Sequence, residues 1–127
     1  MTNQEGIRRT LAQYCHYLDG RKFEEWANLF TEDGEWNGTV SRTAILDSIS
    51  SGALAKRQNL RRKHVCTNII IRLDGADALA ISDFVMYDAT GPGEPWHVAA
   101  WGRYHDRLVK GERGWLFAER KLINSSN

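Results

Sequence analysis

The sequence is poor in cysteine and proline, with two of each among 127 residues. Two cysteines, Cys15 and Cys66, cannot build the dense disulfide framework that stabilises many small secreted domains. We therefore expect both to be buried as small hydrophobic side chains, in a protein that works in the reducing cytoplasm.

The sequence also lacks a long apolar run and an excess of charge of one sign. No apolar run approaches the roughly 18 residues of a membrane span, and residues 1–10 lack the apolar core of a signal peptide. Lys and Arg number 17 against 16 Asp and Glu, which leaves a net charge of +1. Because a nucleic-acid-binding protein is usually far more basic, we expect neither nucleic acid nor a membrane as a partner.

Motifs for common cofactors are missing as well. There is no GxGxxG, P-loop or GxSxG pattern, so nucleotide binding and classical serine hydrolysis have no support. The histidines form no HxH or HExxH pattern and have no cysteine pair nearby, so we expect no metal site and no cofactor. These histidines are His16, His64, His97 and His105.

The composition that remains is that of a globular chain, with 42% hydrophobic and 26% charged residues, and its length predicts a single domain over residues 1–127. The first third has helical spacing. One helix is expected to end at Asp19-Gly20, a second to cover residues 23–30, and a third to follow Ser41 as its cap. The apolar face of the first helix consists of Ile7, Leu11, Tyr14 and Leu18.

The second half is rich in β-branched residues and predicts long strands joined by turns. The expected strands cover residues 65–73, 76–89, 96–109 and 115–122, and residues 124–127 are expected to be loose. Helices followed by a meander of strands indicate an α+β fold in which the helices cover the apolar face of the sheet.

Two residues stand out as candidates for chemistry. Asp19 lies at the edge of the apolar helix face, and it is either an exposed acid at a helix end or a functional carboxylate. His64 opens the first long strand, where alternation places it on one face with Cys66, Asn68 and Ile70. Because both faces of this strand are apolar, both are expected to be covered. His64 is then either a hydrogen-bonded core histidine or a general base.

Aromatic and basic residues offer further candidates. Most of the aromatic side chains belong to the core, but those facing a concave sheet could line a pocket for a ring-shaped ligand. The basic run formed by Lys56, Arg57 and residues 61–63 is either a solvent-exposed connection or an anion-binding site. The aromatic candidates are Tyr14, Tyr17, Trp36, Trp96, Trp101, Tyr104 and Trp115.

The chain resembles the SnoaL-like branch of the nuclear transport factor 2-like superfamily, and within it the scytalone dehydratase-like and polyketide cyclase-like members. The segments that carry the resemblance extend from Ile7 to Leu122, and they are specific in combination although each is weak alone. They are LDG, FEEWANLFTEDGEW, RRKHVCTNIIIRLDGADALA, WGRYHDRL and GWLFAERKL.

The resemblance implies a cone-shaped α+β barrel, in which three N-terminal helices pack on a strongly curved mixed sheet around an internal apolar pocket. It also implies a homodimer or homotrimer. Dehydratases of the family use an Asp at the end of the first helix and a His early in the first long strand, positions that Asp19 and His64 occupy. The carboxylate would hold Nδ1 of the ring and leave Nε2 free as a base.

Further site residues follow from the same resemblance. Substrate-binding candidates are Tyr14, Tyr17, Trp36, Asn68, His97 and Trp101, and Arg103 is expected to pair with Asp106. The family's second catalytic histidine has two candidates here, His97 and His105. Tyr17 can stand for one of the family's two water-binding tyrosines, but the other has no match.

Three functions therefore compete. The first is a cofactor-independent lyase or isomerase that removes a proton from a cyclic, largely apolar or aromatic substrate. The second is a non-catalytic binding or accessory domain resembling the small subunit of ring-hydroxylating dioxygenases. The third is an anion-binding module that uses Arg57, Arg61 and Arg62.

Overall fold

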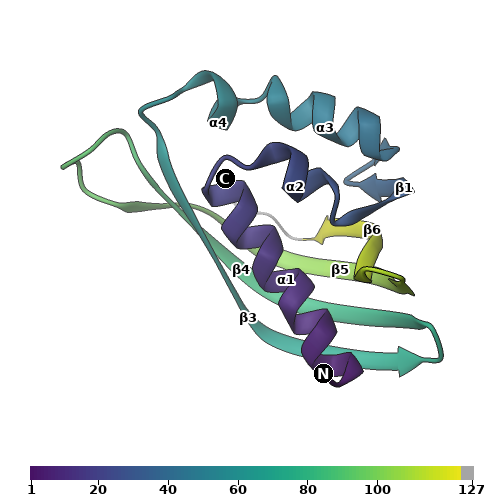
Figure 1. Cartoon of the computed structure of the whole chain (residues 1–127). Coiled ribbons are helices and arrows are strands. Elements are labelled where there is room, and N and C mark those ends of the chain that lie inside the picture. The colour runs from purple at the N-terminus through teal and green to yellow at the C-terminus, as the bar shows by residue number, and fades with distance from the viewer. Residues whose placement is uncertain (124–127) are drawn as a thin grey trace.

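The computed structural model of the chain describes residues 1–123, in which helices come first and long strands follow (Figure 1). The helices are α1 (Asn3–Asp19), α2 (Phe23–Ala27), α3 (Arg42–Ser50) and α4 (Ala53–Lys56). The strands are β1 (Phe30–Trp36), β2 (Thr39–Val40), β3 (Arg61–Asp74), β4 (Asp77–Ala89), β5 (His97–Gly111) and β6 (Gly114–Ile123). The expectation for residues 124–127 lies outside the described residues. None of the helices within residues 1–123 is long and apolar enough to cross a membrane.

Helix α1 forms as the sequence predicts. A capping box starts it, because the Thr2 side chain accepts the Glu5 amide while the Glu5 side chain accepts the Thr2 amide. Its apolar face is buried against the sheet, and the Gly20 amide closes the last turn on the His16 carbonyl at 2.9 Å. Gly6 lets the helix approach β6 closely, since a Cβ there would lie 2.9 Å from Cδ1 of Trp115.

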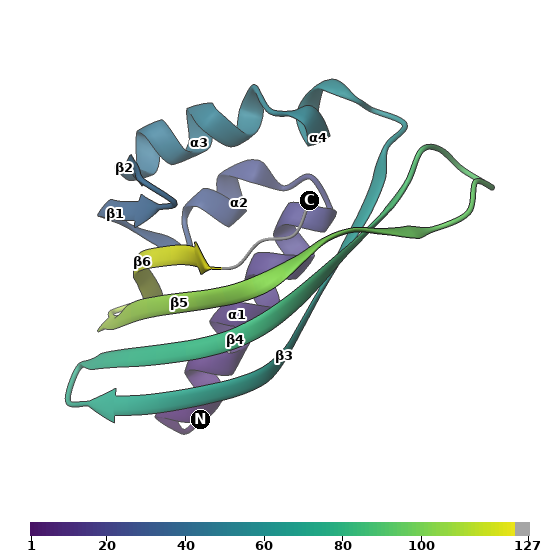
Figure 2. The ribbon, with the colours of Figure 1, turned by 180° about the vertical axis from the view of Figure 1, so that it is seen from behind.

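The strands form one mixed six-stranded sheet in the order β2-β1-β6-β5-β4-β3. Strand β1 runs parallel to β6, and the other neighbours are antiparallel. Strand β3 is therefore an edge strand, and α1 packs across its inner face. Figure 2 shows that, among the helices of residues 1–123, none covers the opposite, outer face of β3–β6.

These features confirm an α+β fold with a mixed sheet, but they differ from the expected barrel in two ways. The sheet twists over α1 without curling strongly into a cone, and a fourth helix, one turn long, follows α3. The expected helix over residues 23–30 ends at Ala27 instead. Its last aromatic residue, Phe30, begins β1 and is fully buried, because pairing with Phe117 of β6 replaces the helical turn.

A β-bulge corrects the predicted faces of β3. The register with β4 shifts by one residue between Thr67 and Ile70, and Asn68 adopts a left-handed φ of 54°. Side chains beyond the bulge therefore change faces, so Asn68 and Ile70 do not share a face with His64. Within this chain nothing in residues 1–123 covers the outer face: Ile70 is 68% exposed on it, with Val65, Leu79, Ile81, Val98 and Trp101 also exposed there.

Cys15 is buried in the core as expected, whereas Cys66 is only partly buried. Burial raises the pKa of the Cys15 thiol from 9.0 to about 12. Above pH 9 the unfolded chain loses this proton while the folded chain retains it, so stability falls as the pH rises. We expect the free energy of unfolding to drop by about 1 kcal/mol more in the wild type than in Cys15→Ala between pH 8 and pH 10. Urea unfolding at both pH values measures this, and equal drops would contradict it.

Candidate functional site

Asp19 and His64 meet where the last turn of α1 crosses the edge strand β3. The His64 backbone N–H donates to Oδ2 of Asp19 at 2.8 Å, and the other carboxylate oxygen, Oδ1, lies 2.6 Å from Nδ1 of the ring. One carboxylate thus holds the backbone and the side chain of the same residue. This contact favours the tautomer with the proton on Nδ1, in which Nε2 keeps a free lone pair.

The surroundings of the imidazole are aromatic. Tyr14 lies edge-on to the ring at 6.3 Å between centroids, and Phe84 lies at 6.4 Å. Nε2 makes no hydrogen bond to any of residues 1–123. The side chain of His64 is 6% exposed and that of Asp19 18%, so the pair is largely shielded from water but retains a path to it.

Tyr14 connects the Asp19–His64 pair to the rest of the core. Its hydroxyl accepts the Trp36 indole N–H at 3.2 Å. Burial raises the pKa of Tyr14, so its hydroxyl stays protonated at neutral pH and can donate one hydrogen bond. Of the predicted substrate-binding residues, the structure brings Tyr14 and, through it, Trp36 to the pair.

The expected pairing of Arg103 with Asp106 is wrong. Alternation in β5 leaves Arg103 on the outer face, where it binds Asp83 at 2.8 Å, and turns Asp106 inward. Asp106 instead forms a bidentate contact with Arg120 of β6 at 2.9 and 3.2 Å, and both side chains are fully buried. A strand places residues three apart on opposite faces, which separates the two expected partners.

Arg120 lies inside the core against Tyr14. Its Cζ is 4.1 Å from the centroid of the Tyr14 ring and 3.5 Å from that of Tyr104, while Nη1 is enclosed without a hydrogen-bond partner among the described residues. Burial lowers the pKa of Arg120, but the nearby Asp106 carboxylate outweighs this and the guanidinium stays charged. A fixed positive charge therefore lies against the Tyr14 ring.

The remaining predicted substrate-binding residues lie elsewhere. Tyr17 faces a separate hollow between α1, α2 and β6, which Arg9, Asn28 and Trp115 also line. Asn68 and Trp101 lie on the outer face, where the Asn68 amide donates to Asp83 at 2.9 Å.

Neither candidate for a second histidine reaches His64. His105 projects from the outer face, and His97 is exposed at the start of β5, beyond a register shift between Met86 and Tyr87. Within residues 1–123 no group of His, Cys, Asp or Glu side chains is arranged to hold a metal ion.

A pocket of about 440 Å³ opens beside Asp19, between the end of α1 and the start of β3. Arg21 shapes one wall: its guanidinium donates to the Leu54 carbonyl, to the Leu60 carbonyl at 2.6 Å, and to two other carbonyls of the connection before β3. We call this hollow the Asp19 pocket; it is lined by His16, Asp19, Arg21, Gln58, Leu60, Arg61, Arg62, Lys63 and Trp96. The expected solvated connection at residues 61–63 is thus the first part of β3.

Arg120 is the site residue that the sequence-based reasoning did not single out. Strict alternation from Trp115 and Phe117 would turn Glu119 inward and Arg120 outward. Ala118 is an extra residue in β6, as the register with β5 shows, and it reverses these faces. The only signal for Arg120 was its position in the segment GWLFAERKL, which contributed to the family resemblance.

Comparisons with known proteins support the family resemblance. A family model described as the SnoaL-like domain matches residues 1–121. No curated protein matches the sequence.

Three solved structures from Novosphingobium aromaticivorans share the fold. A candidate scytalone dehydratase has 24% identity and a TM-score of 0.81, covering 97% of this chain and 85% of that one. A nuclear transport factor 2-like protein with a cystatin-like fold has 21% identity and a TM-score of 0.81, covering 94% and 80%. The β subunit of a candidate aromatic-ring-hydroxylating dioxygenase has 18% identity and a TM-score of 0.78, covering 94% and 87%. These likenesses establish the nuclear transport factor 2-like fold.

Proposed function

The chain belongs to the SnoaL-like domain family, and we propose that it is a small cofactor-independent lyase or isomerase of the dehydratase or polyketide-cyclase type. Its substrate is cyclic and largely apolar, and its reaction begins with the removal of a proton. The proposal rests on one observation: the Asp19 carboxylate contacts both Nδ1 and the backbone N–H of His64.

In the proposed reaction, Nε2 of His64 takes a proton from a carbon next to a carbonyl group. The electron pair of the broken C–H bond moves into the carbonyl system, giving an enolate. In an isomerisation the proton returns to a different carbon, and in an elimination the electron pair expels a leaving group from the neighbouring carbon. Asp19 balances the charge of the imidazolium that forms.

Two groups at Tyr14, whose ring lies edge-on to that of His64, can offset the negative charge of the enolate oxygen. The Tyr14 hydroxyl is protonated, and Arg120 supplies a permanent charge 4.1 Å from the Tyr14 ring. In a site shielded from water, fixed groups of this kind stabilise developing charge more effectively than water does. The candidate scytalone dehydratase among the structural neighbours is consistent with this chemistry.

A second candidate function is a non-catalytic accessory domain, and one observation favours it. Tyr14 and Phe84 fill the interior beside His64, and His64 does not line the Asp19 pocket. In such a domain the Asp19–His64 pair would be a buried structural contact. The dioxygenase β subunit among the neighbours fits this alternative.

Hydrogen–deuterium exchange distinguishes the two functions. We expect the protein in D₂O to exchange α-protons of at least one compound in a panel of cyclic ketones, faster than imidazole does at the same concentration. The reason is that a positioned base reacts at a high effective concentration. Proton NMR follows the loss of the C–H signal. If no compound in the panel exchanges faster than with free imidazole, the lyase or isomerase function is wrong and the accessory domain is favoured.

A further inference from the structure

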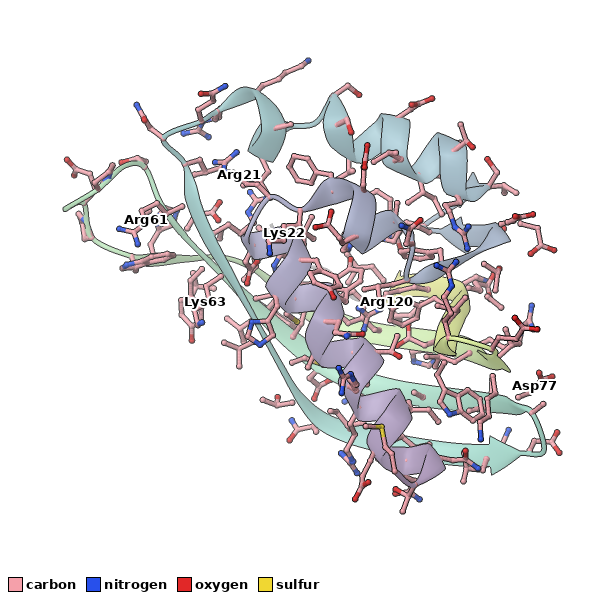
Figure 3. All side chains as sticks on the ribbon, in the orientation of Figure 1. Arg21, Lys22, Arg61, Lys63, Asp77 and Arg120 are labelled. Carbon is pink, nitrogen blue, oxygen red and sulfur yellow. The ribbon has the colours of Figure 1, made fainter. Side chains whose placement is uncertain are left out.

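The Asp19 pocket concentrates positive charge in a chain that is nearly neutral overall. Four basic side chains line it, and Asp19 is the carboxylate among its lining residues. The net charge of the whole chain is +1, so this concentration does not follow from a basic composition. Figure 3 shows Arg21, Arg61 and Lys63 on the same side of the molecule, around the end of α1 and the start of β3.

Only part of this charge is neutralised. Arg62 is paired with Asp88 at 2.8 and 3.0 Å, and Asp19 is engaged by His64. Arg21 donates to carbonyl oxygens, which carry no full charge. Within residues 1–123, Arg61 and Lys63 have no carboxylate at ion-pair distance, so two exposed cations face the pocket unpaired.

Trp96 gives the same pocket an aromatic wall. The residue is 46% exposed, and the Arg61 guanidinium lies over its ring, with Cζ 5.6 Å from the centroid. This contact places a cation over one face of the ring. A ligand ring packed against the exposed part of Trp96 would therefore carry an anionic substituent within reach of Arg61.

We infer that the Asp19 pocket binds an aromatic carboxylate, with its ring against Trp96 and its carboxylate between Arg61 and Lys63. The inference goes beyond the proposed function: it assigns a binding site for an anionic aromatic acid in a pocket that Asp19 lines and His64 does not. A pocket of about 440 Å³ accommodates one or two rings.

The negative charge of Asp19 sets the direction in which this ligand lies. Asp19 repels an anion from its own corner of the pocket, while Arg61 and Lys63 attract it to the opposite side. The uncharged part of the ligand is therefore directed toward Asp19, and its carboxylate toward Arg61 and Lys63.

The test uses two probes of the same shape, 2-naphthoate and its neutral counterpart 2-naphthamide. We expect the whole protein to bind naphthoate about tenfold more tightly than naphthamide in isothermal titration calorimetry at low salt. The preference should shrink to about twofold in 0.5 M NaCl, because the cations are exposed to solvent. Equal affinities at low salt would overturn the inference.

Variants show which residues cause the preference for naphthoate over naphthamide. The double variant Arg61→Gln/Lys63→Gln should bind both probes equally. The control Arg72→Gln/Arg107→Gln removes the same charge from the outer face, where both arginines are exposed, and should keep the tenfold preference. Trp96→Leu should weaken both probes by a similar factor and leave their ratio unchanged. Loss of the preference in the outer-face control, or its survival in the pocket variant, would refute the assignment.

The outcome is separable from that of the proposed function. If naphthoate is preferred as described while no ketone exchanges deuterium, the anion site stands and the lyase or isomerase function is wrong. If ketones exchange deuterium but naphthoate is not preferred, the reaction stands and the anion site is wrong.

Discussion

Replacing His64 by alanine is expected to lower kcat of the proton-transfer reaction by about 10²–10⁴-fold, the usual contribution of a positioned base. The loss should appear mainly in kcat, because Nε2 acts on the reacting proton. His105→Ala is the matched control, since it removes an exposed histidine of the outer face and should leave kcat unchanged. Similar rates for wild type and His64→Ala would contradict the assignment of His64 as the base.

Asp19→Asn tests whether the carboxylate positions the ring, and it should lower kcat over the same range with little change in KM. An asparagine can still accept the His64 backbone N–H through Oδ1, but it then presents an NH₂ group to Nδ1. The ring must accept that hydrogen bond, so its proton moves to Nε2 and the lone pair that would act as base is lost. The same tautomer argument applies to other carboxylate–histidine pairs in enzymes.

A spectroscopic readout separates this effect from simple destabilisation. The ¹⁵N chemical shifts of the His64 ring should change from the Nδ1–H to the Nε2–H pattern in Asp19→Asn, while circular dichroism shows the variant folded. Alanine at the same position would only remove the contact and is a weaker test. An Asp19→Asn variant with unchanged ring shifts and unchanged kcat would show that Asp19 does not set the tautomer.

Local periodicity predicted most of the elements and one part of the site. The face of α1, the end of that helix at Asp19-Gly20 and the four long strands follow from spacing and turn residues, and the structure confirms them within a few residues at their ends. The Asp19–His64 contact could not be derived that way, because it joins residues 45 apart. The family resemblance supplied it.

Three register shifts explain most of what the sequence did not predict. One in β3 separates Asn68 from the face of His64, one in β5 lies just before Ala100, and one in β6 turns Arg120 into the core. A bulge reverses every side chain beyond it, and no residue pattern in these strands signals one. The exposed outer face is a different case, because the homodimer or homotrimer predicted to cover it stays a prediction.

Breaking the Asp106–Arg120 pair is expected to have the largest effect on stability. Asp106→Ala leaves the Arg120 guanidinium fully buried with no counter-charge, and a change of this kind typically costs about 3–5 kcal/mol. The Tyr14, Tyr104 and Phe117 rings around Arg120 offset only part of this loss. Urea unfolding of wild type and variant measures the difference.

Two comparisons show whether burial is the cause. Asp83→Ala removes the carboxylate of the Arg103 pair on the outer face, where Arg103 and Asp83 are 50% and 30% exposed, and should change the free energy of unfolding little. The double variant Asp106→Leu/Arg120→Met removes both buried charges and should be more stable than Asp106→Ala alone, because no uncompensated charge remains. If Asp106→Ala does not fold, Asp106→Asn provides the same comparison with a smaller loss of volume.

The Asp106→Leu/Arg120→Met variant also tests function, because a purely structural role of Arg120 and a catalytic role predict different values of kcat. If the Asp106–Arg120 pair served stability alone, an apolar replacement that fills the space should retain kcat. If Arg120 also offsets the charge of the enolate oxygen, the stable double variant should fold and yet lose activity. Measuring kcat on the folded Asp106→Leu/Arg120→Met protein therefore decides whether the buried guanidinium 4.1 Å from the Tyr14 ring takes part in the reaction.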